Sequence, residues 1–118
     1  MSNGNLPFSM DFLMEQCGGS KTVVDMVLDE FLTQVPNDTA EMEACMASGD
    51  LATASKAAHR LKGTAGTIGA EKLHPLCAAM ELACKEGKAQ EANSIYAELK
   101  KEAQLCVDAV PIAKAKIS

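Results

Sequence analysis

The sequence from residue 49 to residue 69, GDLATASKAAHRLKGTAGTIG, indicates the fold most directly. Its apolar residues recur at alternating intervals of three and four, which places them on one side of an α-helix. Gly49 can end a preceding helix and Asp50 can cap the next one, so the turn is short and the two helices run antiparallel. We therefore predict a helix over residues 51–67 that packs in a bundle. Its apolar seam consists of Leu51, Ala54, Ala58, Leu61, Ala65 and Ile68.

The residues before this stretch predict a short helix followed by a long one. Ser9 can cap a helix over residues 10–17, which the pair Gly18 and Gly19 then ends. Ser20 can cap the next helix, because apolar residues recur at helical spacing in the residues that follow.

Pro36 lies inside this second run of helical spacing. A proline removes one backbone hydrogen bond from a helix and bends it. Because the apolar rhythm continues up to Gly49, we expect one long, bent helix. A break after Pro36, with Asn37 or Asp38 as a new cap, is the alternative.

Two more helices are predicted after the quoted stretch. The first covers residues 71–85, where Pro75 is tolerable only near the first turn. The last covers residues 91–115, and Pro111 is expected to kink or end it.

The composition supports a helical fold. The chain has 118 residues, 47% of them hydrophobic and 3% aromatic, and it is rich in residues that form helices well. This length is typical of one domain. We predict an all-α fold, an antiparallel four-helix bundle with a short extra N-terminal helix. It forms a single domain over residues 1–118, with an ordered core from about 9 to 112.

Charge and cysteine content narrow the classes of partner and the compartment. The net charge of −5 argues against nucleic acid, which needs a positive surface. Residues 1–7 lack the basic and apolar regions of a signal peptide, and no apolar run is long enough to span a bilayer. The 5 cysteines form no C-x-x-C pair and are expected to be reduced. We therefore expect a cytoplasmic monomer.

His59 is the candidate reactive residue of the quoted stretch. It lies about 100° around the helix from the seam residue Ala58, so it points to the rim of the bundle. It shares its stripe with Lys62, Gly63 and Gly66. Glycines weaken a helix, and close approach of another surface to the imidazole would explain them.

Positive charge accumulates around His59. No acidic residue lies between Asp50 and Glu71, whereas Lys56, Arg60 and Lys62 do. An imidazole is a nucleophile near neutral pH, and a neighbouring cation could neutralise phosphoryl oxygens. These residues fit an ordinary surface histidine among solvated lysines equally well.

The run from His59 to Gly69 resembles the signature of histidine phosphotransfer (HPt) domains, commonly written H-x-L-K-G-x-[SA] with an apolar residue and a glycine further on. A Gly-Asp turn before the histidine helix, as in Gly49 and Asp50, extends the resemblance. So do Leu76-Cys77 and Met80-Glu81 on the following helix.

The resemblance implies roles for individual residues. His59 corresponds to the phosphoacceptor, Lys62 to the lysine that offsets phosphoryl charge, and Gly63 to the glycine that leaves the imidazole accessible. Glu81 fits the position that holds the other imidazole nitrogen, although Pro75 could change the register that brings it to His59. Lys85, one turn beyond Glu81, is expected to add positive charge.

The resemblance also implies a phosphocarrier without autokinase activity in a two-component phosphorelay. Its partners would be response-regulator receiver domains and a hybrid sensor histidine kinase, with no membrane contact. No cofactor is expected on this chain, and Mg²⁺ would belong to the receiver domain. The receiver domain is expected to dock around His59, where Met10, Phe12 or Leu13 of the first helix could contribute.

Two alternatives come from other functional classes. His74, Cys77 and Cys84 lie on one side of a predicted helix and could form a metal or redox site, although core packing explains the cysteines more simply. The chain could also be a helical adaptor with the HPt fold that docks to signalling partners without being phosphorylated.

Overall fold

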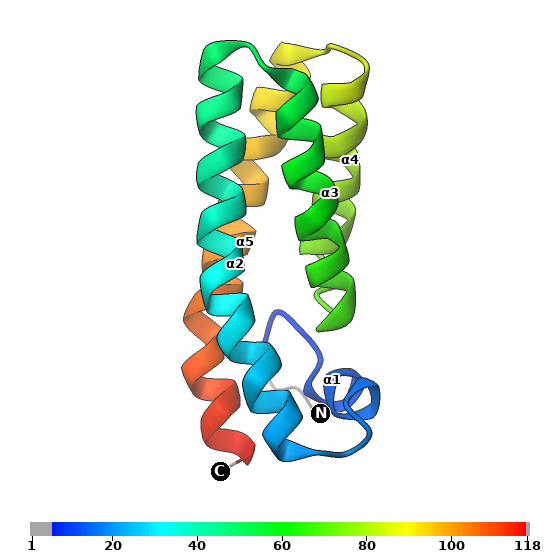
Figure 1. Ribbon diagram of the computed structural model, residues 1–118, viewed down its shortest axis with the longest axis vertical. Helices are drawn as coiled ribbons and strands as arrows, with labels where there is room; N and C mark the ends of the chain where they lie inside the picture. Colours follow the sequence, from blue (N-terminus) through cyan, green and yellow to red (C-terminus); the bar gives the residue numbers. More distant parts are fainter. Residues whose placement is uncertain (1–5, 118) are drawn as a thin grey trace.

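The computed structural model describes residues 6–117. This part of the chain forms helices and no strand. Each of the four long helices contacts the next, and the last returns to contact the first, as Figure 1 shows. The predicted all-α, four-helix bundle with a short N-terminal helix is therefore confirmed. The helices are α1 (Met10–Gln16), α2 (Lys21–Ser48), α3 (Leu51–Thr67), α4 (Leu73–Lys85) and α5 (Ala89–Ile117).

Capping side chains mark the starts of α2 and α3, and a glycine marks the end of α2. The Ser20 hydroxyl accepts a hydrogen bond from the Val23 N–H at 3.2 Å, and Asp50 accepts one from the Thr53 N–H at 3.1 Å. Gly49 adopts a φ of +80°, a left-handed conformation that strongly favours glycine. The turn predicted from the sequence is therefore present, and it reverses the chain between α2 and α3.

The prolines inside α2 and α5 do not end their helices. Helix α2 runs through Pro36 as one element, so the alternative break at that residue is wrong. Helix α5 continues past Pro111 to Ile117, two residues beyond the predicted end at 115, so of the two expected effects of Pro111 a helix end is wrong. Pro111 is exposed, whereas Val110 and Ala113 are buried in the core. Packing on both sides of the proline holds the helix where the local rule predicts a stop.

Helix α4 begins two residues later than predicted. The sequence indicated a start at Glu71, but the helix begins at Leu73. Pro75 explains the difference, because a proline ring clashes with the carbonyl four residues earlier in a helix. Starting at Leu73 places Pro75 in the first turn, where no backbone N–H is needed.

The unequal lengths of the long helices give α1 its place. Helices α2 and α5 have 28 and 29 residues, whereas α3 and α4 have 17 and 13, so one end of the bundle is only half covered. Helix α1 lies across this end (Figure 1). The Ser9 N–H donates to the Ile68 carbonyl at 3.1 Å, and the rings of Phe8 and Phe31 lie 6.2 Å apart.

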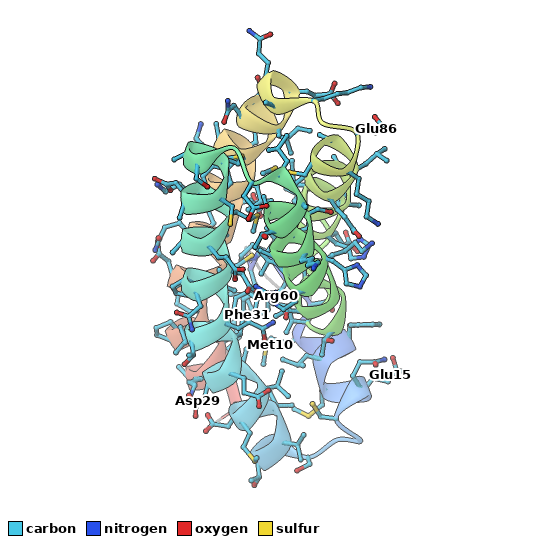
Figure 2. The ribbon with its side chains drawn as sticks, turned by 45° about the horizontal axis from the view of Figure 1, so that its top comes forward. Met10, Glu15, Asp29, Phe31, Arg60 and Glu86 are labelled. Atoms are coloured by element: carbon cyan, nitrogen blue, oxygen red, sulfur yellow. The ribbon has the colours of Figure 1, made fainter. Side chains whose placement is uncertain are left out.

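The core is continuous from Phe8 to Ala113. Figure 2 shows Phe31 and Met10 directed into the bundle, whereas Glu15 and Asp29 extend outward. Within residues 6–117, no helix is long and apolar enough to cross a membrane. Most of the N-terminal segment used to argue against a signal peptide lies outside the described residues, so that expectation stays a prediction.

We predict that Leu61→Ala lowers the free energy of unfolding by about 3 kcal/mol, because Leu61 is fully buried in the α3 seam. Urea denaturation followed by circular dichroism measures this change. Leu82→Ala is the matched control on α4, where the side chain is 56% exposed, and it should change stability by less than about 0.5 kcal/mol. Equal losses in both variants would contradict the assignment of the core.

Candidate functional site

His59 lies on the exposed side of α3 and is held from behind by α4. Its side chain is 66% exposed, and its Nδ1 lies 3.0 Å from Oε2 of Glu81. The register between the two helices therefore brings together the residues that the resemblance paired. Pro75 does not disturb this register, because it lies in the first turn of α4.

Glu81 is the centre of the polar cluster at this rim. Although charged, it is only 7% exposed. Its Oε1 lies 2.8 Å from the Lys62 ammonium, and its Oε2 lies 3.2 Å from that of Lys85. Two lysines and one imidazole thus surround a single carboxylate. Since a carboxylate withdrawn from water is stable only with such partners, the cluster compensates its burial.

These contacts keep Glu81 ionised. The hydrogen bond from Lys62 is the main reason that the pKa of Glu81 falls from its ordinary 4.5 to about 2, with further contributions from Lys85 and His59. Partial burial acts in the opposite direction but is outweighed. At neutral pH the cluster therefore contains a full negative charge.

The ionised carboxylate selects the tautomer of His59. A carboxylate only accepts hydrogen bonds, so the hydrogen of the neutral ring lies on Nδ1 and donates to Glu81. The lone pair then lies on Nε2. Among residues 6–117, no side chain or backbone group bonds to that nitrogen. The arrangement presents a nucleophilic nitrogen to solvent and fixes its direction.

Helix α3 leaves the space beside His59 empty. A Cβ added to Gly63 would have no atom within 4 Å outside its own stretch of helix, so any side chain there would extend into open space next to the imidazole. Gly66, which shares the predicted stripe, instead lies against the ring of His74, with 3.5 Å between the added Cβ and Cδ2. The structure therefore agrees with the expected open access to the imidazole at Gly63, whereas Gly66 packs against His74.

A second contact fixes α4 behind the histidine. The buried hydroxyl of Ser55 donates to the backbone carbonyl of Glu81 at 3.3 Å. Ser55 lies one turn before His59 on α3. The side chain and the backbone of Glu81 are thus both tied to α3, which restricts how far the carboxylate can move from the imidazole.

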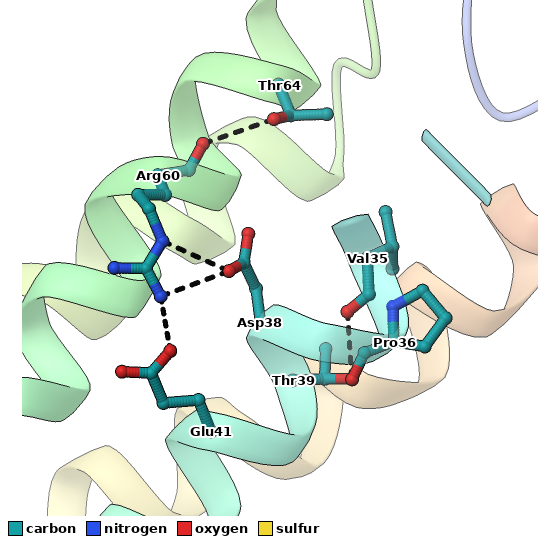
Figure 3. A network of polar contacts seen from close by, with 7 residues as sticks. All are labelled: Val35, Pro36, Asp38, Thr39, Glu41, Arg60 and Thr64. Carbon is teal, nitrogen blue, oxygen red and sulfur yellow. Dashed lines mark hydrogen bonds and ion pairs between the residues drawn. The ribbon is translucent and has the colours of Figure 1, made fainter. Parts of the chain in front are cut away.

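Arg60, next to His59, has partners that the sequence did not predict. Its Nε donates to Asp38 Oδ1 at 3.2 Å, and its guanidinium also pairs with Glu41 (Figure 3). Both acids come from α2. The positive charge counted along residues 51–70 is therefore partly neutralised by acids that lie far away in sequence, and Arg60 links α3 to α2.

Asp38 occupies a core position on α2. It is 4% exposed, and its Oδ2 has no hydrogen-bond partner among the described residues. Burial raises the pKa of this carboxyl, while Arg60 opposes the rise. A signal was present in the sequence, because Asp38 continues the spacing of the buried residues Phe31, Val35 and Met42.

Burial decides which of the other residues proposed from the sequence can contact a partner or a metal ion. Of the α1 residues proposed for docking, Phe12 is 39% exposed, whereas Met10 and Leu13 are buried and cannot meet a partner. The arrangement needed for the alternative metal site is also missing, because the Cys77 and Cys84 side chains are buried while His74 is exposed. Within residues 6–117, no group of three side chains is arranged to hold a metal ion.

A comparison with known protein families agrees with this geometry. The sequence model described as the Hpt domain matches residues 26–109, which include α3, α4 and the whole cluster around His59. The chain belongs to the Hpt domain family. This Hpt domain is 30% identical over 97 residues to the phosphorelay intermediate protein rdeA of Dictyostelium discoideum. The match covers 82% of the chain but only 38% of that protein's length.

Solved structures support the fold of this Hpt domain. A histidine-containing phosphotransfer protein of Pseudomonas aeruginosa superposes with a TM-score of 0.85 at 18% identity, covering 92% of this chain and 95% of that one. The HPT domain of a Shewanella sensor hybrid histidine kinase gives 0.83 at 20% identity, covering 95% and 97%. At this identity the likeness establishes the bundle and not the chemistry.

We predict that Glu81→Gln lowers the free energy of unfolding by about 2 kcal/mol at pH 7, because the amide cannot pair with the surrounding cations. The lowered pKa of Glu81 means that its stabilisation is complete above pH 4.5 and is lost as the pH falls towards about 2. The difference between wild type and variant should therefore vanish over that range in urea titrations. A difference that keeps its neutral-pH size at pH 2 would contradict a pKa of about 2 for Glu81.

For this measurement Glu86→Gln is the control. Glu86 lies just after α4, and among the described residues its carboxylate pairs only with Lys88; its side chain is 46% exposed. Its substitution should change the free energy of unfolding by less than about 0.5 kcal/mol at pH 7.

We predict that Arg60→Met destabilises the protein mainly by leaving Asp38 buried without a cation. The loss should be about 3 kcal/mol in the wild-type background and about 1 kcal/mol when Asp38→Asn is already present. A double-mutant cycle by urea denaturation measures the coupling between the two residues. Additive losses would show that the ion pair contributes nothing beyond packing.

Proposed function

We propose that this Hpt domain accepts a phosphoryl group on Nε2 of His59 and exchanges it with the aspartate of a response-regulator receiver domain. One observation carries the proposal. The Nδ1 of His59 is bound to the buried carboxylate of Glu81, while the rest of the ring is exposed and Nε2 is unbonded among the described residues. This is the geometry that an imidazole needs to act as a nucleophile towards a partner.

The transfer step uses residues of the cluster in distinct ways. The Nε2 lone pair forms the bond to phosphorus while the bond between phosphorus and the aspartate oxygen breaks, and the carboxylate leaves with the electron pair. The ring becomes positive, and Glu81 stabilises that charge through Nδ1–H. Lys62 and Lys85 contribute positive charge beside the phosphoryl oxygens. The reverse step follows the same path.

The partners belong to the same proposal. The name of the Dictyostelium relative and the kinase origin of the Shewanella domain support a phosphorelay with a sensor histidine kinase as the ultimate donor. The receiver domain would dock over α1, α2 and α3, where Phe12 is exposed and a hollow of about 430 Å³ is lined by Val27, Arg60 and Gly63 among others. The chain would act as a carrier without autokinase activity or bound cofactor, and Mg²⁺ would be held by the receiver.

We predict that phosphoramidate adds one acid-labile phosphoryl group to the wild-type protein and none to His59→Gln, because only His59 combines exposure with an oriented ring. His74→Gln is the matched control, since the chain has 2 histidines, and it should react like wild type. Intact-mass measurement before and after acid treatment detects the adduct. If His59→Gln is also modified, or if wild type is not, the phosphocarrier function is wrong. The hypothesis of a helical adaptor that only docks to partners is then favoured.

Transfer from His59 to the receiver aspartate is tested in a separate experiment. Phosphorylated protein mixed with an isolated receiver domain and Mg²⁺ should lose its phosphoryl group within minutes, and the group should appear on the receiver. A receiver whose acceptor aspartate is changed to alanine is the control for spontaneous hydrolysis. Equal loss with both receivers would remove the aspartate from the proposal.

A further inference from the structure

A cavity away from the His59 cluster contains a charged group that the phosphotransfer function does not use. The cavity has a volume of about 350 Å³ and lies between the segment before α1, the loop from α3 to α4, and α5. This volume is within the range of small-ligand sites. None of its lining residues belongs to the cluster around Glu81.

Glu102 of α5 lines this cavity and is only 9% exposed. Among residues 6–117, no hydrogen bond or ion pair satisfies its carboxylate. Glu81, the other buried glutamate, has three partners at its carboxylate. The Glu102 oxygens are not among the solvent-inaccessible atoms of residues 6–117, so the carboxylate of this largely buried side chain faces the open space of the cavity. A carboxylate there, without an internal partner, can bind a cation. Glu102 therefore provides an unfilled binding position for positive charge.

The walls of the cavity are suited to an alkyl group. Leu6, Pro7 and Phe8 form one side and Leu105 of α5 another. Leu105 is 56% exposed, so the cavity opens towards solvent beside it. An apolar stem can lie along these residues while its charged end reaches the carboxylate, as the stems of arginine and lysine do elsewhere.

Lys72, a cation of the chain that lies in the cavity lining, does not pair with the Glu102 carboxylate. Lys72 lines the same cavity, yet no ion pair joins it to Glu102. It precedes α4 without a side-chain capping bond and is exposed. The hydrogen bond from the Ser9 N–H to the Ile68 carbonyl joins the segment before α1 to the end of α3 beside the cavity.

We propose that this cavity binds an alkylguanidinium group, with the guanidinium on the Glu102 carboxylate and the alkyl stem against Leu6, Phe8 and Leu105. A guanidinium is favoured over an ammonium because it is less strongly hydrated and binds a carboxylate through two hydrogen bonds. The group can belong to a free small molecule or to an arginine side chain of a peptide. Both sources share the same chemistry at Glu102.

The test uses butylguanidinium as the probe and the full chain labelled for NMR. Saturable shifts of the backbone amides of Glu102, Leu105 and Lys72 are expected, with millimolar affinity. Glu102→Gln should weaken binding by about tenfold, because it removes the charge that pairs with the guanidinium. Butanol, which has the stem without the charge, should not saturate. Equal binding by wild type and Glu102→Gln would overturn the proposal.

Glu71→Gln is the matched control for general attraction of cations. Glu71 lines the same cavity but is exposed. This variant should bind butylguanidinium within about twofold of wild type, because an exposed carboxylate contributes little to an ion pair. If it loses as much affinity as Glu102→Gln, the attraction is not specific to the buried carboxylate and the proposal is wrong.

Two further measurements complete the test. Glu102→Gln should unfold at about the same temperature as wild type, since no internal hydrogen bond or ion pair of the described residues is lost. A clearly lower melting temperature would show an internal partner and overturn the site. A blocked Ala-Arg-Ala peptide then identifies the source. Binding like butylguanidinium supports a protein arginine, binding of butylguanidinium alone supports a small molecule, and binding of neither overturns the proposal.

Discussion

The ionised carboxylate of Glu81, withdrawn from solvent between α3 and α4, is the constraint on which the arrangement of the site depends. A buried negative charge must be met by donors, and here these are one imidazole and two ammonium groups. Each of them is thereby drawn to the same rim of the bundle. The direction of the His59 ring, the hydrogen on Nδ1 and the position of Lys62 are consequences of this single compensation.

Much of the fold could be predicted because helix spacing and capping are local properties of the sequence. The Gly49 and Asp50 turn and the bounds of α3 follow from the residues within a few positions of each end. The helices containing Pro75 and Pro111 were placed less well. Their true bounds depend on which turn the proline occupies and on neighbouring buried residues such as Ala113, which a local rule does not include.

The contacts of the functional site could likewise be predicted only in part. The pairing of His59 with Glu81 could be anticipated because the family resemblance supplied a register between two helices. The partners of Arg60 were missed, although the predicted turn at Gly49 and Asp50 makes α2 antiparallel to α3 and so places Asp38 and Glu41 opposite Arg60. A stricter reading of spacing would have found Asp38 at a seam position. The charge along residues 51–70 does not give the local potential, because acids on the facing side of α2 neutralise part of it.

The position of α1 across the half-covered end has a consequence for how the chain assembles. Three of the four interfaces between long helices join elements that are consecutive in sequence, a topology that favours rapid folding. The N-terminal segment is different, because Ser9 and Phe8 contact Ile68 and Phe31, which lie far from them in sequence. The four long helices can therefore pack first, and the N-terminal segment can dock on them afterwards. The same segment is the natural first unit to open, so amide hydrogen exchange in α1 should report a local equilibrium rather than global unfolding.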